Sequence, residues 1–227
     1  TKTLTEAESK QLLSLAGIPI MERAVAANVD EAVRLADTLG YPVVAKIVSP
    51  QIAHKSEVGG VAIGLVDAEA VRSACEGILI SVKQKAPQAS IDGLLIERMA
   101  GAGGMEVFVG VQRDEVFGPI MSFGLGGIYV EVFKDISRRM LPLTPMTCEE
   151  MVREVQCFPL LDGARGKPKC DLKALQELLL KVSEFVLANP QVQEIDLNPV
   201  WVGAQGQGAI ALDAVVIVEE SSNNQSE

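Results

Sequence analysis

The chain has 227 residues, of which 48% are hydrophobic and 22% are charged. This composition is typical of a globular protein that buries a substantial core, as one large domain or two small ones. The net charge of −10 repels phosphate backbones, so we expect no nucleic-acid partner. No apolar stretch approaches the ~20 residues that span a bilayer, and the first residues lack the apolar core of a signal peptide. We therefore expect no membrane association.

The first part of the chain alternates between predicted helices and strands. Thr5 and Glu8 match a capping box at the start of a helix, and Gly17 is typical of its end. Asp67 is a typical N-cap residue for a later helix. Between them, hydrophobic spacing predicts a strand at 21–26, a helix at 30–39 and strands at 43–48 and 61–66.

The remainder of the chain predicts a largely antiparallel sheet. Strands are expected at 93–99, 105–113, 116–124 and 128–134, followed by a helix at 172–187 and two final strands at 194–202 and 209–218. The whole chain then forms a small α/β lobe at about 18–94 and a larger α+β lobe at about 95–218, which includes the N-terminal helix. The polar tail at 219–227 is expected to be disordered.

The final hairpin is expected to gather oxygen atoms suited to a metal. Its turn, GAQGQG, occupies residues 203–208, so a symmetric hairpin places Asn198 opposite Asp213 on the same face. Asp196 lies two residues before Asn198 and shares that face. Magnesium prefers hard oxygen ligands and usually completes its coordination with phosphates and water. The alternative is an ordinary solvent-facing hairpin.

A lysine and two glycine loops are candidates for phosphate binding. Lys46 lies within the apolar strand VVAKIV, where it needs solvent, a carboxylate or a phosphate as its partner. Gly59 and Gly60 follow in a loop whose backbone N–H groups can approach phosphate oxygens closely. A second glycine loop, FGLGG, contains Gly126 and Gly127. Neither loop is a Walker A loop, because the sequence contains no GxxxxGK[ST].

Four further polar residues have both a functional and an ordinary reading. His54 is the only histidine, and an imidazole can act as an acid, a base or a phosphoryl acceptor, or can simply lie on the surface. The chain has one histidine and four cysteines without CxxC spacing, which does not fit a zinc site. We expect the cysteines to be reduced thiols in the cytoplasm. Glu97 and Glu106 can bind ribose or hold a phosphate-binding lysine, or can lie on exposed strand faces. Arg165, between glycines, suits an anion.

Taken in order, these motifs resemble the β subunit of ADP-forming acetyl-CoA synthetases. The motifs are AKIVSPQIAHKSEVGGV, LLIERM, GGMEVFVGVQRD, FGLGG, LLDGARG, EIDLNPV and LDA. The resemblance covers roughly residues 5–218, and the chain is more distantly similar to the β subunit of succinyl-CoA synthetase. It implies an ATP-grasp fold of the α/β (α+β) class, in which two lobes enclose a nucleotide.

The resemblance also implies roles for individual residues. Lys46 matches a lysine that contacts nucleotide phosphates, and His54 matches a histidine of a phosphoryl relay. Glu97 and Met99 match the segment that frames adenine. The other matches are Glu106 near the ribose and Asn198 and Asp213 for magnesium. Further candidates are Gly59 and Gly60 for the nucleotide, and Gly126, Gly127, Glu131, Arg165 and Asp196 as phosphate-binding or supporting residues.

The implied reaction interconverts acyl-CoA, ADP and phosphate with an acid, CoA and ATP through a phosphohistidine, with Mg²⁺ as cofactor. The resemblance places the CoA-binding elements on a separate α subunit, in an α2β2 heterotetramer, or elsewhere in a fused chain. Two alternatives remain open. A carboxylate–amine ligase of the ATP-grasp class would need Lys46 and magnesium but not His54, and a nucleotide-sensing module of a fusion protein would bind ATP without catalysis. The sequence does not specify the acid.

Overall fold

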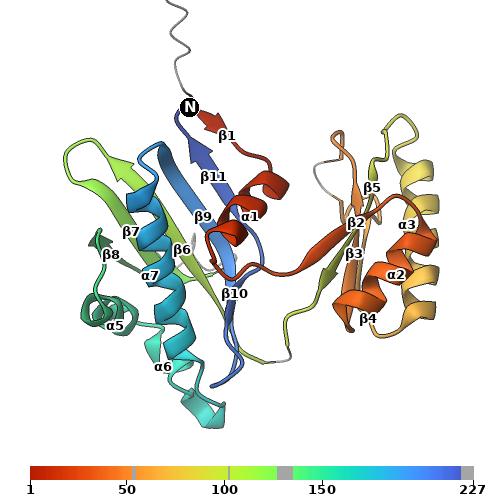
Figure 1. Ribbon diagram of the computed structural model, residues 1–227. Coiled ribbons are helices and arrows are strands. Elements are labelled where there is room, and N and C mark those ends of the chain that lie inside the picture. Colours follow the sequence, from red (N-terminus) through yellow and green to blue (C-terminus); the bar gives the residue numbers. More distant parts are fainter. Residues whose placement is uncertain (53–54, 102, 127–134, 221–227) are drawn as a thin grey trace, which may run out of the picture. The chain divides into compact units, whose positions relative to one another are not determined.

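The computed structural model describes residues 1–52, 55–101, 103–126 and 135–220, which form two compact units (Figure 1). Unit 2 is Met21–Ala100, and unit 1 combines Thr1–Ile20 with Gly101–Glu227. Each unit has its own sheet and its own hydrophobic core. Across the described ranges, no helix is both long enough and apolar enough to cross a membrane.

Unit 2 is a four-stranded antiparallel sheet with the strand order β2–β5–β3–β4. Its elements are β2 (Arg23–Ala26), α2 (Val29–Leu39), β3 (Val43–Val48), β4 (Val61–Leu65), α3 (Ala68–Lys85) and β5 (Gly93–Arg98). Asn28 and Asp67 cap the two helices by accepting hydrogen bonds from backbone N–H groups in their first turns. Both helices pack on one face of the sheet.

The alternation of side chains along β3 determines which of them face these helices. Val43, Ala45 and Ile47 are fully buried in the core that α2 and α3 complete. Lys46 lies between them and is partly exposed. Because successive side chains of a strand point to opposite faces, Lys46 lies on the face away from α2 and α3.

Unit 1 is a larger antiparallel sheet with the strand order β1–β11–β9–β6–β7–β8, in which β10 also pairs with β9. Its strands are β1 (Lys2–Thr3), β6 (Met105–Asp114), β7 (Gly118–Leu125), β8 (Ile136–Met140), β9 (Val192–Val202), β10 (Ala209–Ala211) and β11 (Val215–Val218). Its helices are α1 (Glu6–Leu15), α5 (Pro145–Glu154), α6 (Phe158–Leu161) and α7 (Leu172–Ala188). Buried leucines of α7, among them Leu175 and Leu179, pack with Val109 and Phe123 of the sheet.

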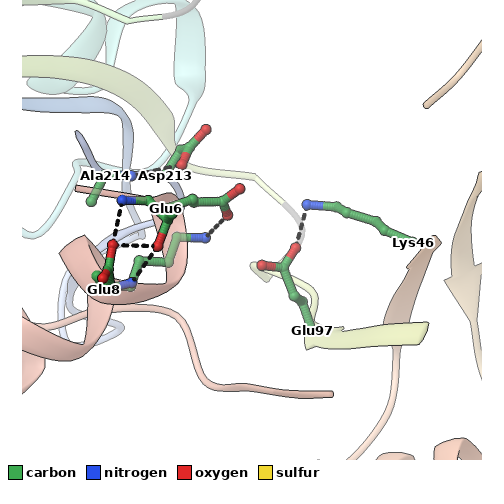
Figure 2. Close-up of polar contacts among 8 residues, drawn as sticks. Glu6, Glu8, Lys46, Glu97, Asp213 and Ala214 are labelled. Carbon is green, nitrogen blue, oxygen red and sulfur yellow. Dashed lines mark hydrogen bonds and ion pairs between the residues drawn. The ribbon is translucent and has the colours of Figure 1, made fainter. Parts of the chain in front are cut away.

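The structure differs from the sequence-based expectation at several elements. β1, β8, α5 and α6 were not expected. The final strand, expected as one element at 209–218, is divided into β10 and β11 by a bend at Leu212, next to which the Asp213 carboxylate accepts a hydrogen bond from the N–H of Ala214 at 2.7 Å (Figure 2). The strand expected at 128–134 lies outside the described residues. The capping box of Thr5 and Glu8 is confirmed.

Candidate functional site

Lys46 forms an ion pair with Glu97 on the face of unit 2 that lies away from its helices (Figure 2). The pair joins neighbouring strands, because the β3–β5 register places Glu97 opposite Val44. The Glu97 side chain is only 7% exposed, compared with 32% for Lys46. A carboxylate so deeply buried needs a cation beside it. An ammonium group has three N–H donors, so Lys46 can bind a phosphate in addition to this carboxylate.

Both the backbone and the side chain of Met99 hold the segment that follows β5. The Met99 N–H donates to the carbonyl of Pro42 at 2.9 Å. The Met99 Sδ atom accepts a hydrogen bond from the N–H of Gly64 at 3.1 Å. Gly64 has a φ of +73° and lies where the β3–β4 register shifts. The segment that the resemblance assigns to adenine is therefore tied to the irregular part of β4.

The loop at 55–60 is packed against helix α3 and strand β3. Ser81 Oγ donates a hydrogen bond to a carbonyl of this loop at 2.8 Å. A Cβ atom at Gly59, whose φ is +69°, would lie 2.5 Å from Ser81 Oγ. A Cβ atom at Gly60 would lie 2.6 Å from Ile47. Both glycines are thus needed for the packing of the loop itself. His54, just before this loop, lies outside the described residues.

The strand register of unit 1 places Asn198 opposite Asp213. Strand β9 pairs with β10 up to Ala211 and with β11 from Val215, in the same register on both sides of the break. Asn198 and Asp213 occupy the facing positions between these pairs, as a symmetric hairpin predicts. Asp196 precedes Asn198 by two residues and therefore points to the same face.

Asp196 lies in surroundings that oppose its negative charge. Burial raises the pKa of this carboxyl group, and the negative charges of Glu194 and Asp213 raise it further. Its Oδ1 atom is buried and has no hydrogen-bond partner within the described part of the chain. A divalent cation would supply the missing contact and offset the repulsion between the carboxylates. The oxygen atoms of Asp196, Asn198 and Asp213 therefore fit Mg²⁺.

These side chains form only a partial coordination shell. Among the residues that the structure describes, no group of three His, Cys, Asp or Glu side chains is placed to hold a metal, and the third donor here is the amide oxygen of Asn198. Mg²⁺ usually takes one or two carboxylates from a protein and its other ligands from phosphates and water. The arrangement thus suits a magnesium ion that is bound together with a nucleotide.

Glu106 lies exposed on β6 beside the start of the second glycine loop. Its backbone carbonyl accepts a hydrogen bond from the N–H of Gly126 at 3.0 Å. A Cβ atom at Gly126 would lie 2.7 Å from the carbonyl oxygen of Val107, a contact that only glycine avoids. Gly127 and Glu131 lie outside the described residues.

Arg165 lies in a short 3₁₀ helix, Ala164–Gly166. Gly163, the residue before this helix, has a φ of +92°, a backbone conformation that favours glycine. An ion pair of 2.9 Å between Asp162 and Lys169 closes the loop that carries Arg165. The structure places this loop in unit 1, with the magnesium candidates, whereas Lys46, Glu97 and Met99 belong to unit 2.

Two residues near these groups were not anticipated from the sequence. Arg23 lies directly opposite Glu97 in the β2–β5 register. The indole N–H of Trp201 donates to the carbonyl of Gly103 at 2.9 Å, and a Cβ atom at Gly104 would lie 2.7 Å from that nitrogen. In both cases the available signal was one large polar or aromatic side chain in an otherwise apolar strand, which does not reveal its neighbour.

The two units, each built on an antiparallel sheet with helices packed against it, have the architecture of the ATP-grasp class. The family model of the ATP-grasp domain matches residues 1–218, so the chain belongs to this family.

Within this family, the chain is 45% identical over 217 residues to the β subunit of acetate–CoA ligase [ADP-forming] I of Pyrococcus furiosus, which covers 96% of this chain and 92% of the relative. It is 44% identical over 204 residues to acetate–CoA ligase [ADP-forming] I of Archaeoglobus fulgidus, which covers 90% of this chain and 30% of that longer relative. The resemblance found in the sequence is therefore confirmed.

A solved structure with the same fold is the dinucleotide-forming acetyl-coenzyme A synthetase 1 of Candidatus Korarchaeum cryptofilum. That structure is a complex with coenzyme A and Mg-AMPPCP, in which a phosphohistidine segment points towards the nucleotide binding site. The TM-score is 0.81 and the identity is 37%, over 96% of this chain and 93% of the other. The expected ATP-grasp fold is confirmed.

Proposed function

We propose that this chain is the nucleotide-binding subunit of an ADP-forming acid–CoA ligase. This enzyme interconverts acyl-CoA, ADP and phosphate with a free acid, CoA and ATP. The observation that carries the proposal is the full-length similarity to a β subunit of this class, at 45% identity over 96% of the chain. Residues of the shared motifs also occur in arrangements that suit nucleotide and magnesium.

Unit 2 provides the contacts that we assign to the nucleotide. The Lys46 ammonium group binds phosphate oxygens while Glu97 holds it in place. The backbone of Met99, whose N–H donates to Pro42 and whose side chain accepts from Gly64, frames the adenine. Gly59 and Gly60 shape the loop that we place near the phosphates, while their own N–H groups donate to the carbonyls of Ser56 and Lys55 at 3.1 and 2.7 Å. A lysine that is already in position stabilises negative charge without reorganising during the reaction.

In unit 1, Asn198 and Asp213, supported by Asp196, would hold Mg²⁺. When bound, the ion would neutralise negative charge on the nucleotide phosphates. The raised pKa of Asp196 means that protons compete with the ion for this carboxylate. Glu106 near the ribose and Arg165, Gly126, Gly127 and Glu131 near phosphates complete the proposed set.

The phosphoryl group reaches ADP from a phosphohistidine. In this step the N–P bond of the phosphohistidine breaks, an O–P bond to the terminal phosphate of ADP forms, and the histidine is released. We assign His54 to this relay, and the loop that follows it is held by Ser81. The related structure in which a phosphohistidine segment points towards the nucleotide binding site supports such a transfer.

The chain acts together with CoA-binding elements. The relative named as a β subunit implies a partner subunit, and the longer relative, of which this chain spans 30%, shows that related chains also exist as part of one larger polypeptide. We propose an α2β2 assembly with a CoA-binding α subunit, in the cytoplasm.

A reconstitution experiment tests the proposal. The chain is mixed with its cognate CoA-binding subunit, ATP, CoA, Mg²⁺ and a panel of acids, and thioester formation is measured with each subunit alone as a control. Activity only in the mixture, with ADP and phosphate as products, is the expected result and also names the acid. Tight ATP binding without thioester formation would instead favour a nucleotide-sensing module. Acyl transfer to an amine would favour a carboxylate–amine ligase.

Variants of the site sharpen this test. Lys46→Ala and Asp213→Ala should each lower turnover at least about 100-fold, because each removes a group that stabilises the transferring phosphoryl group. Glu149→Ala is the matched control, since this exposed carboxylate pairs with Arg153 on the same helix, outside the proposed site. His54→Ala should block phosphoryl transfer but spare nucleotide binding. Near-normal turnover of the first two variants would overturn the site assignment.

A further inference from the structure

Glu97 lies between two cationic side chains on the face of unit 2 that its helices leave open. On one side, β3 supplies Lys46, which forms the ion pair described above. On the other side, the β2–β5 register places Arg23 directly opposite Glu97. Facing residues of an antiparallel pair have their Cβ atoms about 4.5–5.5 Å apart and point to the same face. A single buried carboxylate thus has one cationic residue on each of its two neighbouring strands.

This arrangement matters because Lys46 is shared between two partners, Glu97 and a phosphate, in the proposed function. Glu97 as a whole residue is only 5% exposed, so the charge of its carboxylate needs a cation whether or not a nucleotide is bound. If Lys46 were its only counter-ion, any movement of the ammonium group towards a phosphate would leave a buried carboxylate uncompensated. Nucleotide binding would then have to overcome this cost.

Arg23 is suited to be the second counter-ion. A guanidinium group is always charged, is more weakly hydrated than an ammonium group, and matches a carboxylate with its planar donors. With Arg23 in place, the three residues carry a net charge of about +1 rather than zero. The charge of Glu97 is then offset even when the Lys46 ammonium group engages an anion.

We propose that Arg23 is a positioning residue for nucleotide binding. It keeps Glu97 compensated and so frees Lys46 to engage the phosphates. The inference rests on the proposed function, in which Lys46 contacts phosphate. Arg23 acts through Glu97 and Lys46 and need not touch the nucleotide itself.

The test measures ADP and adenosine binding to the full chain by calorimetry in the presence of Mg²⁺. Arg23→Gln should weaken ADP binding by about tenfold, a usual size for coupling between contacting groups, and leave adenosine binding unchanged, because adenosine lacks phosphates. Arg23→Lys, which keeps the charge, should restore most of the ADP affinity. The matched control is Arg72→Gln, because Arg72 is also paired with a carboxylate, Asp30, but joins the two helices on the other face.

A double-mutant cycle separates an indirect role of Arg23 from a direct one. In a Glu97→Gln background there is no carboxylate to compensate, so Arg23→Gln should have no further effect on ADP affinity. An equal loss in both backgrounds would mean that Arg23 binds the nucleotide directly, and would overturn the proposal. Equal losses of ADP and adenosine affinity would show a merely structural role and would also overturn it.

The outcomes distinguish this inference from the proposed function. If the unaltered chain binds no ADP, the proposed function itself fails. If the unaltered chain binds ADP and Arg23→Gln binds it equally well, only the role of Arg23 is refuted. If Arg23→Gln does not fold, Arg23→Met, which keeps most of the apolar stem but not the charge, takes its place and should show the same tenfold loss of ADP affinity.

Discussion

The surroundings of Asp196 disfavour its ionised form, and this lowers the free energy of unfolding at neutral pH. Its pKa in the folded chain is raised above the ordinary value of 3.8, through burial and the charges of Glu194 and Asp213. Folding therefore favours the protonated form. Stability falls as the pH rises from that ordinary value through the raised pKa, and it stays lower at neutral pH.

Replacing this charge should stabilise the protein in the absence of metal. We expect Asp196→Asn to raise the Tm at pH 7 in EDTA; for a chain of this size, each 1 kcal/mol of added stability raises the Tm by about 2–4 °C. At a pH below the ordinary aspartate pKa, the difference should disappear, because both side chains are then neutral. Thermal unfolding followed by circular dichroism measures both values. A variant that is less stable at pH 7 would contradict the pKa argument.

The residues of the candidate site differ in how far the sequence could predict them. Asn198 and Asp213 face each other because the turn between their strands is symmetric, and a turn can be counted in the sequence. The sequence left Lys46 with three candidate partners, namely solvent, a carboxylate or a phosphate. Its pairing with Glu97 depends on which strands are neighbours, and this cannot be read from the sequence. The sequence gives no reason to place Arg23 beside Glu97, because β2 and β5 lie far apart in the chain and only their register brings the two residues together.

Among the structural elements, the glycine loop after β7 depends on close backbone contact. A Cβ atom at Gly126 would approach the O, C and N atoms of Val107 to within 2.7–2.9 Å, and none of these atoms can move as a side chain does. We therefore expect Gly126→Ala to destabilise the protein by about 1–3 kcal/mol.

A second glycine serves as the control for this change. Gly77 lies exposed in the middle of α3, and a Cβ atom there would meet nothing within 4 Å. Gly77→Ala should stabilise the protein by about 0.5–1 kcal/mol, because alanine loses less backbone entropy in a helix. Urea titrations of both variants provide the two free energies. If both changes had the same sign, the contact at Val107 would not explain the effect.

The elements that the sequence predicted best are those with local signals. The caps at Thr5 and Asp67 fixed the starts of α1 and α3, and the apolar spacing fixed α7. β8, with the sequence ISRRM, has no such pattern, because it exists through its pairing with β7. Helix α5 had a usable signal that was overlooked, namely the capping residue Thr144 followed by Pro145.

For the whole molecule, the separate cores of the two units suggest that they lose structure separately. All four cysteines are buried free thiols, and burial raises the pKa to about 11 for Cys75 and Cys148 and to about 12 for Cys157. Native protein should therefore react with thiol reagents only after local or global unfolding. Cys75 belongs to unit 2 and the other three cysteines belong to unit 1, so the thiols report on each unit.

Alkylation at increasing urea concentrations, read by peptide mass spectrometry, tests this independence. We expect Cys75 to become reactive at a lower urea concentration than Cys148, Cys157 and Cys170, because unit 2 has the smaller core and buries less apolar surface. Simultaneous labelling of all four thiols would show that the two units unfold as one cooperative body.

The pairing of β1 with β11 has a consequence for synthesis of the protein on the ribosome. Lys2 lies opposite Val218, and Ile20 forms a bridge with Ala211, whereas unit 2 is encoded entirely between these ends. At about 5–20 residues per second, the N-terminal segment emerges on the order of ten seconds before its partner strand is made. The nascent chain can complete unit 2 in the meantime. Unit 1 has to wait for β11, because β1 pairs with that strand.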